Sequence, residues 1–247
     1  MASVASVTFS PEPFAACVQQ AAARHDVQQM VARLWQRDAA LWSRDPAVQQ
    51  QIRSRLGWLS IVGVMRSRAE EILAAAQEIR QHGFTHALLL GMGGSSLFAE
   101  VCRRTFGVSP GWLDLTVLDT TDPTAIAAAR QRVPLERTLF IVSSKSGTTT
   151  ESRTLCDYFY DEVRAQRKAE AGRQFIAITD AGTPLEAEAK ARNFRHVFVH
   201  GPATGQDVGG RFSALTCFGL VPAALLGIDI RRLLGRAQEM LDGCQPS

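Results

Sequence analysis

Three short strings of glycine, hydroxyl and basic residues carry the chemistry that this sequence offers. The first is GMGGSS at residues 91–96, directly after the apolar run 87–90. Its glycines permit a tight turn and a close approach of the backbone to a ligand. The helix expected after it would present free N–H groups to an anion. We therefore expect a phosphate to bind where Ser95 and Ser96 open this helix; the alternative is a strand-to-helix turn that needs glycine for its geometry alone.

The second string, SSKSGTTTES at residues 143–152, follows the apolar run 139–142, and seven of its ten residues carry hydroxyl groups. Hydroxyl and backbone N–H groups can together satisfy the acceptor oxygens of a phosphate. Thr148 and Glu151 match a capping box, which predicts that a helix begins here with its positive end at the loop. The Walker pattern GxxxxGK[ST] is absent. Lys145 would supply either a point charge or a structural ion pair. We therefore expect a phosphate at this loop, which contains Ser144, Lys145, Ser146, Gly147, Thr148 and Thr149; the alternative is a surface turn rich in serine and threonine.

The third string is DVGGRFS at residues 207–213, after the apolar run that ends near His200. Its glycines, Gly210 among them, leave the backbone exposed, and Arg211 stands at the start of a helical pattern. Arginine stays charged and binds oxyanions through two parallel hydrogen bonds. We therefore expect Arg211 to face an anionic ligand. The structural alternative is an ion pair between Arg211 and Asp207.

These strings are placed by an alternation of short apolar runs and helical patterns that begins after residue 83. Continuous apolar runs of about four residues are typical of strands that are covered on both faces. The alternation predicts an α/β fold, a doubly wound three-layer sandwich with a mostly parallel sheet of about five strands. Ligands of such sheets bind at the carboxyl ends of the strands. The expected strands are 87–90, 115–118, 139–142, 175–178 and 197–199, and the expected helices lie near 95–106, 124–132, 149–170 and 184–192.

Residues 1–82 show a helical sequence pattern without strand-like runs. We predict that they form an N-terminal helical segment before a sheet domain at 83–247. Apolar residues recur with helical spacing at 27–34 and again at 69–79. Asp45 and Pro46 predict the start of a helix, with Asp45 as its cap. The stretch 57–64 is expected to be a connector.

Composition excludes several classes of protein. Of 247 residues, 46% are hydrophobic and 21% are charged, which argues against a disordered chain. The net charge of +3 comes without long runs of like charge, so we expect no nucleic-acid partner. The five widely spaced cysteines indicate reduced thiols, mostly in the core, and no metal site. No secretory signal is visible, and the apolar stretch 214–228 is too short for a bilayer, so we expect a cytoplasmic protein without membrane contact.

Taken together, the strings GMGGSSL, SSKSGTTTES and DVGGRFSALTCFGLVPAAL resemble the glucose-6-phosphate isomerase family, which has the sugar isomerase (SIS) fold. The resemblance covers most of residues 30–235, and the strings RLWQRDAALW and RLGWL look like the isomerase part of bifunctional transaldolase–isomerases. It implies isomerisation of glucose 6-phosphate to fructose 6-phosphate through an enediolate, a step of glycolysis and gluconeogenesis, without a cofactor. It also implies that Gly94, Ser95, residues 144–149 and Gly210 bind the sugar phosphate and that Arg211 lies beside the reacting carbons.

The family's catalytic glutamate, and a histidine and a lysine that act with it, come later in the sequence than these strings. This chain ends at Ser247 without a counterpart of any of them. Its Glu100, Glu151, His196 and His200 do not stand in a context that resembles the family's base. We expect a chain that holds the phosphate site but not the proton-transfer groups. Either a homo-oligomer or a separate C-terminal half would complete the site.

Two other functions remain open at this point. A non-catalytic SIS module that binds a phosphosugar would share the SKSGTT loop and need no base, although it would have no use for Arg211. A dinucleotide-binding dehydrogenase domain could use Asp119, which follows the second apolar run, to bind a ribose. Its GxGxxG fingerprint fails at Ser96, where a third glycine is required.

Overall fold

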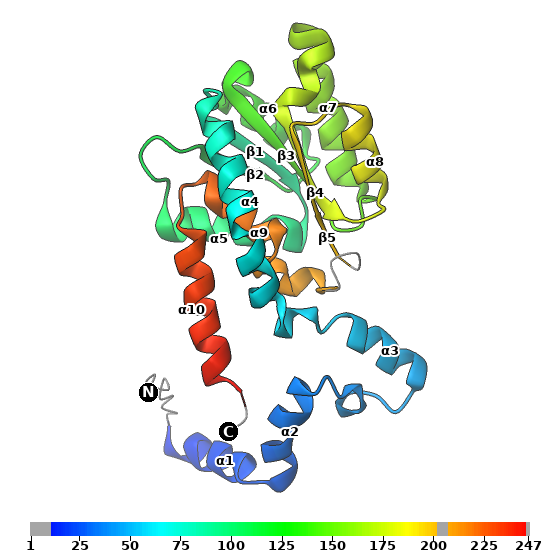
Figure 1. The fold of residues 1–247 in the computed structure, drawn as a ribbon, viewed down its shortest axis with the longest axis vertical. Coiled ribbons are helices and arrows are strands. Elements are labelled where there is room, and N and C mark those ends of the chain that lie inside the picture. The colour runs from blue at the N-terminus through cyan, green and yellow to red at the C-terminus, as the bar shows by residue number, and fades with distance from the viewer. Residues whose placement is uncertain (1–10, 202–206, 246–247) are drawn as a thin grey trace.

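A parallel sheet flanked by helices occupies the upper part of the view in Figure 1. The structure is a computed structural model that describes residues 11–201 and 207–245. The strand order is β2-β1-β3-β4-β5, and every neighbouring pair runs parallel. Each strand contains one of the five apolar runs, which confirms the α/β fold expected from the sequence. The strands are β1 (His86–Gly91), β2 (Asp114–Leu118), β3 (Thr138–Ser143), β4 (Phe175–Asp180) and β5 (His196–His200).

Different helices cover the two faces of the sheet, as a doubly wound fold requires. In β1, Ala87 and Leu89 pack into the core on one face, whereas Leu88 and Leu90 pack into the core on the other. This alternation follows from the two-residue period of a strand, and it explains why strands buried on both faces appear as continuous apolar runs. One face is covered by α4 (Ile61–Gln81), α5 (Leu97–Phe106), α9 (Cys217–Leu225) and α10 (Ile230–Gly243), and the other by α6 (Pro123–Arg132), α7 (Thr150–Arg167) and α8 (Pro184–Ala191).

The strand order places a switch point between β1 and β3. The chain leaves β1 for β2 on one side, then returns across β1 to form β3 on its other side. Connections from β1 and β3 therefore depart toward opposite faces, and a crevice is left at their carboxyl ends. Parallel sheets of this order bind ligands in that crevice.

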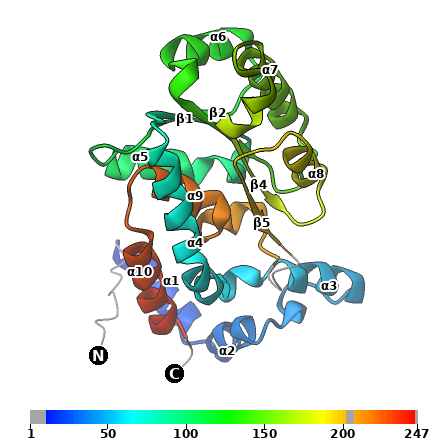
Figure 2. The same cartoon turned by 45° about the horizontal axis from the view of Figure 1, so that its top comes forward.

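The N-terminal region begins with three helices that lie away from the sheet in both views (Figures 1 and 2). They are α1 (Glu12–Ala22), α2 (His25–Trp35) and α3 (Pro46–Ser54). The expected start of α3 is confirmed, because the carboxylate of Asp45 accepts a hydrogen bond of 2.8 Å from the N–H of Ala47. The helical spacing at 27–34 is also confirmed by α2, although Met30 and Val31 are about half exposed.

The expectation of a connector at 57–64 is wrong. Only a short 3-10 turn, η2 (Gly57–Leu59), precedes α4, which already begins at Ile61. Ile61, Val62 and Met65 are buried against the core beside the sheet, and this packing fixes the first turn of the helix. Although α4 precedes the domain boundary expected at residue 82, its buried face is part of the core that covers the sheet.

The cysteines divide into buried and exposed groups. Cys102, Cys156 and Cys217 lie in the core, where burial raises the pKa of their thiols to about 11, 12 and 11 respectively. Cys17 and Cys244 are exposed. In the described part of the chain, every helix is too short or too polar to cross a bilayer.

Candidate functional site

The loop after β1 is a tight turn that leads directly into a helix. Residues Gly93–Ser95 form the 3-10 turn η3, and α5 begins at Leu97. Gly93 has φ of +56°, a backbone conformation that favours glycine. Ser96 is almost fully buried, and its hydroxyl donates to the carbonyl of Gly93 over 3.2 Å. This serine therefore stabilises the turn from within instead of facing solvent.

The loop after β3 presents backbone donors at the start of the longest helix on its side of the sheet. Within the described residues, the N–H groups of Lys145, Ser146 and Thr149 have no acceptor. The hydroxyl of Ser144 donates to that of Thr149 over 3.0 Å, so both lie beside these donors. Unpaired N–H groups, hydroxyls and a helix N-terminus are together typical of an anion site.

The predicted capping box in this loop is wrong. Helix α7 begins at Thr150, its N-cap residue is Thr149, and no side chain caps it. The hydroxyl of Thr148 instead lies 2.9 Å from that of Ser146, which also accepts from the N–H of Thr148. These local bonds inside the loop compete with capping, and the first N–H groups of α7 have no acceptor in the part of the chain that the structure describes.

The third string forms the 3-10 segment η7 (Gly210–Leu215), just before α9. Arg211 is exposed and, among the residues described, has no hydrogen-bond or ion-pair partner. It lines a hollow of about 500 Å³ together with the backbone of Gly94 and Gly210. The other residues of this hollow are Gly93, Leu97, Phe98, Val101, Ser213 and Ala214.

Direct contacts join the three loops pairwise. Ser143 donates through its hydroxyl to the carbonyl of Ser95 over 2.8 Å, which links the β3 and β1 loops. Ser213 donates to the carbonyl of Gly94 over 3.1 Å, which links the β1 loop to η7. The side chain of Lys145 closes the set by reaching the segment that precedes η7. The structure therefore gathers the three strings at one edge of the sheet.

Lys145 forms the structural ion pair that the sequence left as one of two options. Its ammonium group donates to Asp180 at the end of β4 and, over 2.8 Å, to Asp207. Burial acts to lower the pKa of this lysine, but the hydrogen bonds to both carboxylates outweigh it and raise the pKa. Asp207 therefore pairs with Lys145 and not with Arg211, so that alternative from the sequence is wrong. Asp180 was missed, although it stands at the carboxyl end of a strand, where ligands of such sheets bind.

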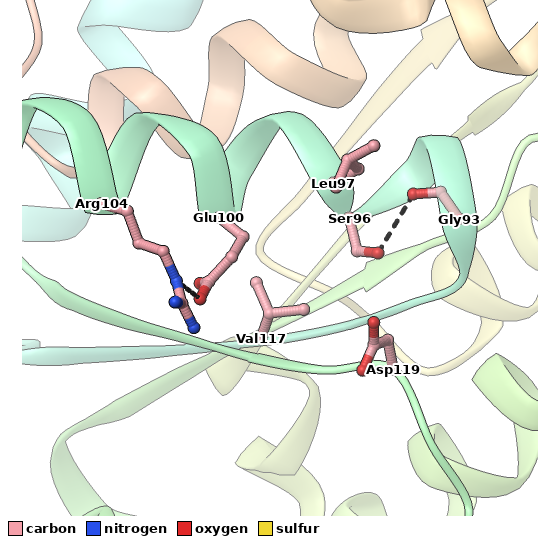
Figure 3. A pocket seen from close by; sticks show the side chains of 7 residues that line it. All are labelled: Gly93, Ser96, Leu97, Glu100, Arg104, Val117 and Asp119. Atoms are coloured by element: carbon pink, nitrogen blue, oxygen red, sulfur yellow. Dashed lines mark hydrogen bonds and ion pairs between the residues drawn. The ribbon is translucent and has the colours of Figure 1, made fainter.

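A second hollow, of about 390 Å³, lies between α5 and the end of β2 (Figure 3). Glu100 and Arg104 form an ion pair of 2.5 Å on one side of it, and Asp119 lies opposite Ser96 on the other. This is the region that a dinucleotide would require. Ser96, however, is buried in the turn at the position that the fingerprint reserves for glycine.

None of the four candidate bases lies in the hollow that Arg211 lines. Glu100 is paired with Arg104, and Glu151 is exposed in the first turn of α7.

The two histidines lie at the two ends of β5. His196 is at its amino end, away from the loops, and contacts Glu78 over 3.0 Å. His200 ends the same strand but is 1% exposed, and both of its ring nitrogens lack a partner among the described residues.

A doubly wound sheet with glycine-rich and hydroxyl-rich loops at its switch point defines a class of α/β proteins that bind ligands at the carboxyl edge. Comparison with known proteins narrows the class. Residues 60–244 match the family model described as phosphoglucose isomerase. The chain therefore belongs to the phosphoglucose isomerase family.

Curated relatives agree with this assignment, and solved structures share the fold. The chain is 32% identical over 225 residues to the glucose-6-phosphate isomerase of Geobacter sp. (strain M21), covering 88% of this chain and 39% of that protein. A hypothetical protein from Thermus thermophilus superimposes with a TM-score of 0.76 at 25% identity, covering 93% of this chain and 51% of the other. A glucose-6-phosphate isomerase from Chlamydia trachomatis shares the fold, with a TM-score of 0.74 at 22% identity. The match covers 96% of this chain and 47% of the Chlamydia chain. The chain spans about two fifths of the length of the Geobacter relative.

We predict that Gly94→Ala destabilises the protein and that Gly210→Ala does not. A Cβ atom on Gly94 would lie 2.0 Å from the carbonyl oxygen of Gly210, whereas a Cβ on Gly210 meets nothing within 4 Å. The Cβ atom of Gly94→Ala would force the two loops apart, which should lower the free energy of unfolding by about 1–3 kcal/mol. Urea unfolding of both variants measures the difference, and equal stabilities would show that the two backbones are not in contact.

The buried His200 predicts a loss of stability in mild acid. Burial, together with the nearby Arg68 and Lys145, lowers its pKa from 6.5 to about 4. The unfolded chain therefore takes up a proton first. The stability that the neutral ring contributes is complete above pH 6.5 and is lost as the pH falls toward 4, at up to about 1.4 kcal/mol per pH unit. A His200→Asn variant should show a shallower slope in unfolding experiments across this window; an unchanged slope would contradict the assignment.

Proposed function

We propose that this chain binds a hexose 6-phosphate through its three loops and forms the phosphate-binding part of a glucose-6-phosphate isomerase. The observation that carries the proposal is the set of unpaired N–H groups at Lys145, Ser146 and Thr149, at the start of α7 and beside the switch point. A phosphate there would accept hydrogen bonds from these donors and from the hydroxyl of Thr149, which itself accepts from the hydroxyl of Ser144. The helix dipole would add about 0.3–1 kcal/mol for an exposed anion.

Arg211 has the properties of a group that stabilises a developing negative charge. Its guanidinium carries a permanent charge, and no partner in the described residues neutralises it. Isomerisation of an aldose phosphate to a ketose phosphate moves a proton between C1 and C2 through an enediolate. A guanidinium held beside those carbons would stabilise the enediolate oxygen, and losing such a donor typically costs on the order of 10²–10³ in rate. We assign this role to Arg211.

Proton transfer also needs a base within hydrogen-bond reach of the substrate carbon. The hollow around Arg211 is lined by glycine, serine, alanine and larger apolar residues, without a carboxylate or an imidazole from the described residues. We propose that the base comes from a partner subunit or from a C-terminal half of the enzyme. The same observation favours a second candidate function, a non-catalytic module that binds a phosphosugar and uses no base.

Removing one hydroxyl from the anion site should weaken binding. We predict that Thr149→Val lowers the affinity for fructose 6-phosphate by about ten- to a hundredfold, since a hydrogen bond to a charged group contributes about 1.5–3 kcal/mol. Isothermal titration calorimetry measures the change. Thr154→Val, at an exposed position further along α7, is the matched control and should bind like the wild type. Unchanged affinity for Thr149→Val would place the phosphate elsewhere.

An isomerase assay separates the role of the base from that of the phosphate site. We predict that the 247-residue chain alone converts fructose 6-phosphate to glucose 6-phosphate slower than a complete family member by a factor on the order of 10²–10⁴, the usual contribution of a general base. Full activity would show that no C-terminal half is needed and that a residue of this chain acts as the base, either from the same copy or from a second copy in an oligomer. Tight binding of NAD without binding of a sugar phosphate would instead favour the dinucleotide function.

A further inference from the structure

Lys145 connects three parts of the carboxyl edge of the sheet. Its own loop follows β3, Asp180 ends β4, and Asp207 follows β5. The side chains of all three are partly or largely buried, with 29%, 12% and 28% exposed. Partial burial reduces the screening of such pairs by water, so this network constrains its loops more than an exposed ion pair would.

The charges of this network argue against direct binding of phosphate by the ammonium group. Two carboxylates already compensate the single positive charge of Lys145. A dianionic phosphate next to the ammonium would also lie close to Asp180 and Asp207, and the repulsion would offset the attraction. The phosphate donors of this loop are better supplied by its backbone N–H groups and hydroxyls. The lysine side chain is thus free for another role.

Asp207 is attached to the fold by its backbone as well as by its side chain. Its carbonyl accepts a hydrogen bond of 3.0 Å from the N–H of Gly57, and the neighbouring Val208 forms a bridge with Leu56. A Cβ on Gly57 would lie 2.2 Å from that carbonyl oxygen, so the approach is close. The start of the segment that leads to Arg211 is therefore fixed.

The other end of that segment is fixed as well. Ser213 donates to the carbonyl groups of Gly94 and Gly210, and Phe212 stacks on Trp58 with ring centroids 5.6 Å apart. Arg211 lies between these two attachments and is itself exposed. Its position is therefore set by its neighbours, and Asp207 is the neighbour that the phosphate loop holds directly.

We propose that Lys145 and Asp207 are positioning residues that hold Arg211 in register with the phosphate loop. The inference rests on the proposed function, since it assumes that this loop binds phosphate and that Arg211 serves the sugar carbons. Lys145 joins the two loops, and Asp207 carries the constraint along the chain to Arg211. Loss of the pair leaves the phosphate donors in place but releases the guanidinium from its position.

Two probes separate the phosphate loop from Arg211. Inorganic phosphate requires only the loop, whereas 6-phosphogluconate also carries a carboxylate at C1, one of the two carbons between which the proton moves. For the nearly isosteric Asp207→Asn, we expect the Kd of 6-phosphogluconate to rise about tenfold, within the range of coupling between contacting residues. The Kd of inorganic phosphate should change less than about twofold, since its donors are untouched. Lys145→Met should behave in the same way, and calorimetry measures both constants.

A double-mutant cycle shows whether the effect passes through Arg211. Arg211→Ala should weaken the binding of 6-phosphogluconate. Adding Asp207→Asn to that variant should then change the Kd of 6-phosphogluconate little further. Rescue by Asp207→Glu, which restores the charge, would support the inference. Glu162→Gln is the control, because it breaks the partly exposed pair with Arg130 far from the loops and should leave both constants unchanged.

The possible failures are distinct. If the wild type binds neither probe, the proposed function itself is wrong. If Arg211→Ala weakens 6-phosphogluconate but Asp207→Asn does not, only the positioning role is overturned. If Lys145→Met weakens both probes by the same factor, the lysine binds phosphate directly and the positioning role is also overturned.

Discussion

The pairing of β1 with β3 is the constraint on which the other features depend. Their register runs from His86 opposite Thr138 to Gly91 opposite Ser143, so both strands end at the same level. Because β2 lies on the far side of β1, the connections after the two strands turn toward different faces of the sheet. The gap between them is then bordered by η3 on one side and by the start of α7 on the other. Backbone donors gather there as a result of topology, before any side chain is considered.

Neighbouring residues at the end of β3 serve different purposes, because the strand packs apolar side chains in the core whereas the residues that follow it form hydrogen bonds at the polar edge of the sheet. In β3, the ring of Phe140 packs against those of Phe159 and Phe175, with ring centroids 5.1 and 4.8 Å apart, and the strand is completely buried. One or two residues beyond its last apolar position, Ser143 and Ser144 are equally buried but are hydrogen-bonded to the neighbouring loops. The rigid strand thus carries polar groups to its end in a fixed geometry. Such support allows hydroxyls and N–H groups to stay in place without a ligand.

The strands and most helices could be predicted from the sequence because their signals are local. Apolar runs marked the strands, and Asp45 marked the start of α3. The errors arise where a distant or competing contact decides the outcome. The hydroxyl of Ser146 draws Thr148 away from its predicted cap, and burial against the core extends α4 back to Ile61. The partner of Asp207 is Lys145, which lies 62 residues away in the sequence. Proximity in the sequence favours a pair with Arg211 instead, and only the folded chain brings Lys145 close. Asp180 could have been found from the sequence, because it follows an apolar run at the expected carboxyl end of a strand. It was missed because it lies outside the three glycine-containing strings.

The stacked rings of Trp58 and Phe212 give this protein an internal optical reporter. Trp58 belongs to the N-terminal region, whereas Phe212 directly follows Arg211 in sequence, so the indole senses the segment from outside it. Indole emission depends on its surroundings, and any displacement of that segment would alter them. With only four tryptophans in the chain, replacing the other three would leave one indole, whose emission would follow the position of this segment in real time.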